Sequence, residues 1–312
     1  TGTPIENRLS ELWSIFDFLM PGLLGTRELF AKRFESPVEH AEGDSAARLQ
    51  ALVSPFVLRR VKEDVVADLP EKIEDTVMAQ LTGEQRKLYL ANQDRIAQQV
   101  QHRESSEFKK DKLKVLAELT KLRQICCDPR LHYEDYKAGS AKLDTCMELV
   151  HGALDGGHRI LLFSQFTGML DIIGKRLAKE DIAFLKLTGA SSKESRAKMV
   201  AQFQAGEVPV FLISLKAGGV GLNLTAADVV IHYDPWWNVA AQDQATDRAH
   251  RIGQQHTVTV YKLIAKDTIE ERIMQMQESK RDLVNSVLGG DGISSALFTR
   301  EDVPHLLGGD GR

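Results

Sequence analysis

The chain has 312 residues, of which 43% are hydrophobic and 27% are charged, and its formal net charge at pH 7 is −4. This composition is that of an ordinary folded protein and excludes the collagen-like, disordered and disulfide-scaffold classes. At about 150 residues per domain, the length allows roughly two compact units. The small negative charge gives no sign of a nucleic-acid ligand for the chain as a whole.

The cysteines and the N-terminus indicate the setting of the protein. Cys126, Cys127 and Cys146 are too few for a disulfide framework, and the adjacent pair lacks the spacing of a zinc site. We expect all three to be small buried hydrophobic residues in a reducing, intracellular setting. The chain begins at Thr1 without a Met, and it shows neither a signal-peptide pattern nor an apolar run of about 18 residues that would span a membrane.

The first 140 residues are predicted to be mainly helical. Apolar residues recur at helical spacing from Leu9 to Leu19, and a highly charged tract from 82 to 124 contains few glycines and no proline. The expected elements are a helix ending near Pro21, a polar connector at 36–45, a helix leading to Ser54, and an insert of two projecting helices at 85–101 and 109–126.

After Ala141, short apolar runs alternate with amphipathic segments, which is typical of a parallel α/β layer. The expected strands are 159–163, 184–187, 210–214, 229–233 and 258–264. The expected helices are 142–154, 168–179, one capped by Ser191 with Glu194, 240–252 ended by Gly253, and 268–288. The sequence therefore predicts an α/β fold with a parallel sheet flanked by helices and a mainly helical N-terminal region.

The phosphate-binding loop of nucleotide hydrolases is absent. The nearest segment, 168–176, has five residues between its glycines and no hydroxyl after Lys175, and its apolar stripe favours a helix. The run 229–234 resembles a strand that ends in a magnesium-binding acid, but it continues into Pro235 without a catalytic Glu. These residues alone are therefore predicted not to hold Mg²⁺-ATP and activate water.

Two segments at strand ends carry candidate binding chemistry. A glycine-rich turn follows the strand at 210–214, where bare glycines admit a phosphate to the backbone and Ser214 and Lys216 can donate to it. A plain tight turn is the alternative. The paired tryptophans of the segment 234–238 indicate either core or cleft-wall packing or a contact with a nucleic-acid backbone.

A third segment, 247–254, contains two arginines. Arg248 and Arg251 are three residues apart, so we expect them to share one helix face and to form a fork for phosphate oxygens. Alternatively, cations near a helix C-terminus are simply favoured by the helix dipole, with Gly253 as the cap. His250 between them is expected to be a structural or partly exposed histidine rather than a base.

Seven motifs in this order resemble the signatures of the Swi/Snf family of helicase-like ATPases that translocate on double-stranded DNA, in its bacterial type. They are Gly2-Thr3-Pro4 with Asn7, the block 58–65 together with 69–72, Leu122-Arg123-Gln124-Ile125-Cys126, Phe163-Ser164-Gln165-Phe166, 218–224, Asp234-Pro235-Trp236-Trp237-Asn238 and 248–254. Two departures, Val239 in place of the usual Pro and Cys127-Asp128 in place of Asn-His, are compatible with the pattern.

The resemblance implies a division of the chain. In that family two RecA-like lobes clamp ATP between them and hold DNA across them. The implied parts are the tail of the first lobe (1–57), the inter-lobe linker and helical protrusion (58–140), the second RecA-like lobe with a bracing helix (141–288), and a C-terminal tail (289–312). The N-terminal lobe, preceding Thr1 in the same protein, would supply most of the binding site for ATP and Mg²⁺.

The resemblance also implies roles for individual residues. Arg248 and Arg251 would be arginine fingers that act on the γ-phosphate. The residues facing the nucleotide would be Gly219, Gly221, Asn223 and Gln244, and those contacting DNA phosphates would be Ser164, Gln165, Ser214, Lys216 and Trp237. No metal ligand is expected in the chain itself. Arg59, Arg60 and Lys62 would gate lobe closure, or else form a solvated helix face.

We therefore expect the C-terminal half of an ATP-dependent translocase that moves along duplex DNA and displaces or repositions bound proteins, with only modest DNA affinity in this piece. It would be inactive alone, and cytoplasmic and nucleoid-associated in a bacterium or nuclear in a eukaryote. An RNA helicase is the first alternative, although Gln254 after Gly253 departs from the His-Arg-x-Gly-Arg ending usual there. A non-catalytic binding module acting through its helical insert is the second.

Overall fold

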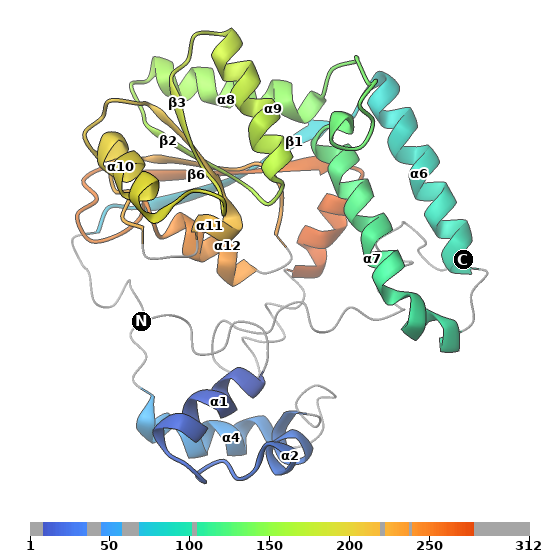
Figure 1. Ribbon diagram of the computed structural model, residues 1–312, viewed down its shortest axis with the longest axis vertical. Coiled ribbons are helices and arrows are strands. Elements are labelled where there is room, and N and C mark those ends of the chain that lie inside the picture. The colour runs from blue at the N-terminus through green and yellow to red at the C-terminus, as the bar shows by residue number, and fades with distance from the viewer. Residues whose placement is uncertain are drawn as a thin grey trace. The chain divides into compact units, whose positions relative to one another are not determined.

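The computed structural model (Figure 1) describes residues 9–35, 45–57, 69–101, 105–218, 222–236 and 239–277. The chain divides into two compact units. The described residues up to 57 belong to the first unit, and most of those from 69 onward belong to the second. The predicted basic block at 58–62 and the tail beyond 289 lie outside the described residues.

The first unit is helical, as expected. Its described elements are α1 (Leu9–Leu19), α2 (Arg27–Phe30), a π-helical turn η1 (Ala31–Glu35), α4 (Ser45–Val53) and a short 3₁₀ turn η2 (Ser54–Phe56). Leu12, Phe16 and Phe30 are among the buried residues of its small core. The helix predicted to end near Pro21 and the one predicted before Ser54 are both confirmed.

The second unit is built on a parallel sheet. The described strands, in the spatial order β1-β6-β5-β2-β4-β3, all pair in parallel. Their bounds are β1 (Lys72–Gln80), β2 (Ile160–Ser164), β3 (Phe184–Leu187), β4 (Val210–Ser214), β5 (Val229–His232) and β6 (Val258–Lys266). The five predicted strands are confirmed, and β1 is an element that the sequence interpretation missed.

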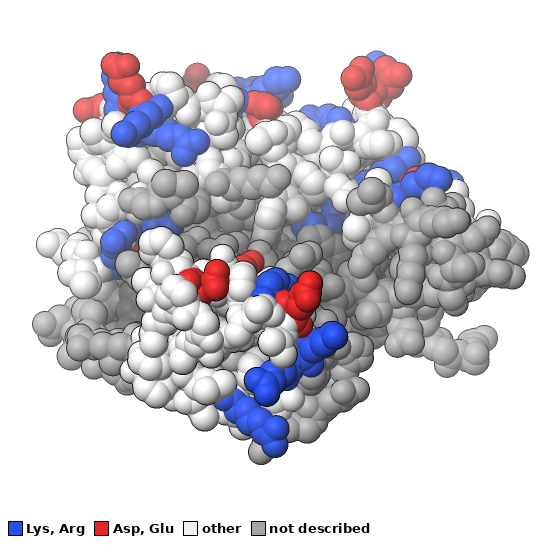
Figure 2. All heavy atoms as spheres, turned by 60° about the horizontal axis from the view of Figure 1, so that its bottom comes forward, with Lys and Arg blue, Asp and Glu red and all other residues white. Residues whose placement is uncertain are grey.

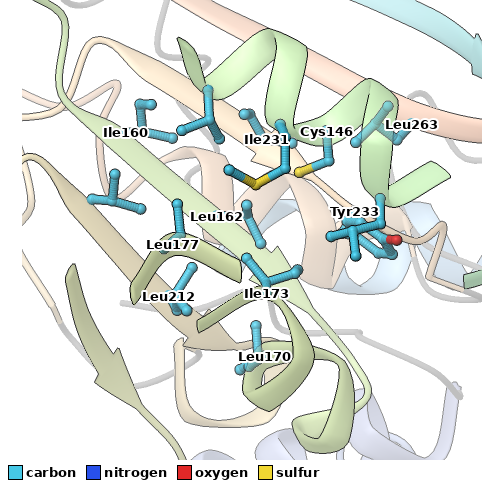
Figure 3. Packing of buried hydrophobic residues seen from close by; sticks show 14 of the residues in the cluster. Cys146, Ile160, Leu162, Leu170, Ile173, Leu177, Leu212, Ile231, Tyr233 and Leu263 are labelled. Carbon is cyan, nitrogen blue, oxygen red and sulfur yellow. The ribbon is translucent and has the colours of Figure 1, made fainter. Parts of the chain in front are cut away.

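Helices cover both faces of this sheet. On one face, α8 (Ala141–Asp155) and α9 (Thr167–Lys179) pack against alternate strand residues such as Leu162 and Leu212, as Figure 3 shows. On the other face, α10 (Lys193–Gln204) and α12 (Val239–Thr246) pack against the intervening residues, such as Phe163. Burial on both faces explains why β2, β4 and β5 are continuous apolar runs.

The predicted helical insert is confirmed as two helices, α6 (Gly83–Gln101) and α7 (Ser105–Cys127), which lie side by side in Figure 1. A salt bridge between Arg95 and Glu118 joins them. A 3₁₀ turn η3 (Pro129–Leu131) leads on to α8. All three cysteines are buried free thiols, as expected.

Three local predictions are corrected by the structure. The helix expected over 240–252 ends at Thr246, so Arg248 and Arg251 lie in the turns that follow and share no helix face. Gly253 therefore does not cap α12, although its φ of 101° uses the freedom of glycine within those turns. The cap of α10 is Ser192, whose side chain accepts from the backbone N–H of Ser195, so the capping box of Ser191 and Glu194 is wrong by one residue.

The last predicted helix is confirmed in part. Residues 269–277 are helical, and the remainder of the expected range to 288 lies outside the described residues. None of the described helices is long and apolar enough to cross a membrane.

Candidate functional site

Two of the predicted site residues, Ser164 and Ser214, lie at the carboxyl edge of the sheet. Ser164 ends β2 and Ser214 ends β4, and the two residues are register partners. The neighbouring strands β2 and β5 are followed by helices on opposite faces, α9 and α12. In open α/β sheets this reversal opens a crevice at the carboxyl ends, where ligands bind. The fold therefore places the candidate site where β2 and β5 end.

Ser164 is buried and holds the loop after β2. Its hydroxyl donates to Asp234 Oδ1 at 2.5 Å, and it accepts from the backbone N–H of Phe166 at 3.1 Å. The Gln165 N–H donates to the Asp234 carboxylate at 3.2 Å. Of the predicted pair at this position, only Gln165 is partly exposed, while Ser164 is engaged internally.

Asp234, which received no role from the sequence, is the centre of this network. Its carboxylate is completely buried, and burial raises its pKa, although the nearby Arg123 guanidinium and the Ser164 hydrogen bond act in the opposite direction. Arg123, on α7, donates to Gln165 Oε1 at 3.1 Å and to the Pro235 carbonyl. Both residues lie within the motifs quoted above, and position in those motifs was the available signal.

The glycine-rich turn is only partly described. Lys216 lies in α11 (Leu215–Gly218), the short helix that continues from β4, and Asn223 is exposed beyond the turn. Gly219 and Gly221 fall outside the described residues, as does Trp237. Its neighbour Trp236 is partly buried against the hydrophobic core, which supports the packing interpretation for that tryptophan. Gln244, on α12, is partly exposed.

The two arginines flank a short turn after α12. The Arg248 side chain is largely buried, whereas Arg251 is exposed. Burial lowers the pKa of Arg248, and the nearby charge of Arg251 lowers it further. The backbone carbonyl of Arg248 accepts from Leu224 N–H at 2.9 Å, so this turn is joined to the end of the glycine-rich segment. The positive charges of Arg248 and Arg251 repel each other, so a bound anion such as a phosphate would be attracted by both.

Gln254 holds the two segments together, a role that was not predicted. Its buried side-chain amide donates to the carbonyls of Ala227 at 2.7 Å, Ala249 at 3.1 Å and Thr225 at 3.2 Å. His250 Nε2 donates to the Pro70 carbonyl at 2.7 Å, which fits the structural interpretation of this histidine. The turn that carries the arginines is therefore fixed from both sides.

The described residues contain no group of three or more His, Cys, Asp or Glu side chains arranged to hold a metal ion. Arg248 and Arg251 supply two cationic groups in the turn after α12. As built from the described residues, the site offers donors for phosphate oxygens and no carboxylate cluster for a divalent cation.

Two family models match the chain: the SNF2-related domain over residues 1–131 and the helicase conserved C-terminal domain over residues 141–253. Among solved structures, the chain is 32% identical to the Sulfolobus solfataricus SWI2/SNF2 ATPase C-terminal domain, with a TM-score of 0.62, covering 76% of this chain and 98% of that one. It is 37% identical to the SWI2/SNF2 ATPase core of the same organism in complex with dsDNA, with a TM-score of 0.64, covering 98% of this chain and 65% of that one.

The curated relatives are longer proteins. A putative ATP-dependent helicase/translocase of Bacillus subtilis, YwqA, is 41% identical over 312 residues, covering 96% of this chain and 33% of that protein. An uncharacterized ATP-dependent helicase of Mycoplasma pneumoniae is 41% identical over 309 residues, covering 98% of this chain and 29% of that protein. The chain thus spans a third or less of their length.

The parallel sheet, its flanking helices and the matches above define a RecA-like lobe of the helicase C-terminal class. With the SNF2-related domain matched ahead of that lobe, the chain belongs to the Swi/Snf family and is a fragment of its ATPase core.

Proposed function

We propose that the chain is the C-terminal half of an ATP-dependent translocase that moves along duplex DNA and displaces or repositions bound proteins without separating the strands. The observation that carries the proposal is the turn with Arg248 and Arg251, which is bonded through the Arg248 carbonyl to Leu224 at the end of the glycine-rich segment. Relatives named as ATP-dependent helicases or translocases, and a solved relative bound to dsDNA, support it.

ATP fits the arginine turn, and Mg²⁺ does not fit the described residues. Bound Mg²⁺-ATP would supply the γ-phosphoryl group that is transferred to water. Arg251 is exposed and would stabilise charge developing on that group, while the largely buried Arg248 would bind a neighbouring oxygen. Gly219, Gly221, Asn223 and Gln244 are proposed to face the nucleotide. Because the described residues form no carboxylate cluster, the N-terminal lobe of the same protein would hold Mg²⁺.

Double-stranded DNA is the proposed track. Gln165, Lys216 and Trp237 would contact phosphates of one strand, which gives binding that ignores sequence. Ser214 is only 4% exposed at the end of β4 and would act indirectly. Ser164 would act indirectly, because its buried hydroxyl bonds Asp234. On the face shown in Figure 2, described basic side chains lie next to described acidic ones. Protein–DNA complexes would be the substrates.

The test uses the full-length protein and compares ATP turnover with and without duplex DNA. Duplex DNA should stimulate turnover, and Arg251→Ala should lower kcat by about 10³-fold or more, with nucleotide binding retained. Lys193→Ala, at an exposed position on α10, is the matched control and should leave turnover unchanged. Unchanged turnover in Arg251→Ala would refute the arginine finger. Separation of RNA strands would favour the RNA-helicase alternative, and DNA binding without any turnover would favour a binding module.

A further inference from the structure

Arg123 links the α6–α7 hairpin to two loops of the sheet edge. It lies near the end of α7 and is 2% exposed. One guanidinium nitrogen donates to the side-chain oxygen of Gln165 at 3.1 Å, and another donates to the backbone carbonyl of Pro235. The first acceptor follows β2 and the second follows β5. A single buried side chain therefore joins α7 to the loop after β2 and to the loop after β5.

The loop after β2 and the loop after β5 are also bonded directly to each other. The Asp234 carboxylate accepts from the Ser164 hydroxyl and from the Gln165 backbone N–H. The Arg123 guanidinium also lies over the ring of Phe166, 5.8 Å from its centroid. The backbone of Gln165 is thus fixed by Asp234, whereas its side-chain oxygen is oriented by Arg123.

The base of the hairpin, where Arg123 lies, is attached to the lobe by several hydrogen bonds. Gln85, in the first turn of α6, donates to the Ile125 carbonyl at 2.9 Å and accepts from Ala141 N–H at 3.1 Å. The Tyr89 hydroxyl accepts from Ile269 N–H at 2.7 Å. These bonds cross from α6 to α7, to α8 and to the last described helix. These bonds hold the base of the hairpin, where Arg123 lies, in place on the lobe.

We propose that Arg123 is a positioning residue that orients Gln165 and the loop after β5 for phosphate contact, and so couples the α6–α7 hairpin to the grip on duplex DNA. This inference rests on the proposed function. Arginine suits the role because its planar guanidinium presents several donors in fixed directions and can serve two acceptors at once, whereas a lysine ammonium is a compact point charge. The positive charge is also needed beside the buried carboxylate of Asp234.

The experiment compares Arg123→Lys with Arg95→Lys in the full-length protein. Arg95 lies on the same hairpin, but its partner Glu118 is on the neighbouring helix and the pair is partly exposed. We expect Arg123→Lys to raise the duplex DNA concentration for half-maximal ATPase stimulation about tenfold, with DNA-independent turnover within about twofold of wild type. Arg95→Lys should change neither quantity. An unchanged half-saturating DNA concentration in Arg123→Lys would overturn the proposal.

A double-mutant cycle separates positioning from general destabilisation. If Arg123 acts through Gln165, the effect of Arg123→Lys on half-saturating DNA should be much smaller in a Gln165→Met background. Equal effects in both backgrounds would refute the role of Arg123 through Gln165.

Hydrogen exchange of the full-length protein without nucleotide or DNA tests the linkage apart from activity. Arg123→Lys should speed exchange at the amides of Gln165, Phe166 and Trp236, whereas Arg95→Lys should not. If the wild-type protein shows no DNA-stimulated turnover, the proposed function fails while this measurement still reports on the linkage. Unchanged exchange at these amides would refute the coupling itself.

Discussion

The ammonium group of Lys142 and the carboxylate of Glu270 form an ion pair at 2.5 Å in which both side chains are 0% exposed. The pair joins the start of α8 to the helix at 269–277. Glu270 also accepts from Ala265 N–H at 2.9 Å, and the Lys142 ammonium lies 5.3 Å from the centre of the Tyr233 ring. Burial alone would lower the pKa of Lys142, but the charge and hydrogen bond of Glu270, together with the charges of Cys127 and Asp234, outweigh it and the pKa is raised.

Removing one partner of this pair is expected to be strongly destabilising. Glu270→Gln leaves the Lys142 ammonium buried without a counter-charge, which should lower the free energy of unfolding by about 3–5 kcal/mol. The double variant Lys142→Met with Glu270→Leu should recover much of that loss, because no charge is then buried. Urea denaturation measures both.

The exposed pair of Lys186 and Asp171 provides the control. Lys186→Met should cost less than about 1 kcal/mol, because exposed ion pairs are screened by solvent. A cost for Glu270→Gln as small as this would contradict the importance of the buried pair.

His232 should make the protein sensitive to mild acid. It ends β5, is 1% exposed, and its Nε2 lies 2.8 Å from the Thr246 hydroxyl. Burial lowers its pKa to about 3, and the charges of Lys262 and Lys72 act in the same direction, opposed by that of Glu74. The folded protein therefore keeps this imidazole neutral at a pH where an unfolded chain protonates it.

The sign of the pH effect follows from this difference. The unfolded state, with a histidine pKa near 6.5, binds a proton as the pH falls, and the folded state does not until the pH is near 3. Stability is thus full above about pH 6.5 and declines below it, by up to about 1.4 kcal/mol per pH unit from this group. Urea denaturation between pH 7 and 5 should show that the free energy of unfolding of His232→Gln falls less with decreasing pH than that of the wild-type protein. The exposed His256→Gln should keep the wild-type slope, and equal slopes for all three proteins would refute the assignment.

Gln254 is expected to matter more than its exposed neighbour. Gln254→Ala removes the donor shared by the carbonyls of Thr225, Ala227 and Ala249, which should cost about 1–3 kcal/mol of stability. Because the arginine turn is then less well held, ATP turnover of the full-length protein should also fall, by about tenfold. Gln255→Ala should affect neither property. If the two variants behave alike in thermal unfolding and turnover, Gln254 does not fix the turn.

Several elements were predictable because their signal is local. The apolar runs of β2, β4 and β5 identified buried strands, since a parallel strand covered on both faces needs no alternation. β1 was missed because its side chains are mostly exposed and polar, so it has no apolar run. Its position is set instead by pairing with β6, from Lys72 opposite Val258 onward. Strand pairing over such a distance leaves no periodic signal in the sequence.

The candidate site likewise combines features that the sequence indicates locally with features that depend on contacts between distant residues. The motifs identified Gln165 and the two arginines as candidate site residues, and the strand topology places Gln165 at the carboxyl edge of the sheet. Sequence spacing, however, predicted that Arg248 and Arg251 share a helix face. In the structure α12 ends at Thr246, and the turns that follow are held by Gln254, which donates to the carbonyls of Thr225 and Ala227. The bond from Arg123 to Gln165 spans 42 residues, and no local pattern reports such a contact.

The last prediction concerns the 312 residues by themselves. We expect no ATP turnover from this chain in the presence of Mg²⁺ and duplex DNA, because its sequence has no phosphate-binding loop and its described residues form no metal-binding cluster. Phosphate release should stay at the level of buffer, while the full-length protein under the same conditions turns over ATP. The Arg251→Ala chain serves as the blank for contaminating activity. DNA-dependent phosphate release that disappears in this variant would show that the chain assembles an ATPase site alone, and would contradict the dependence on an N-terminal lobe.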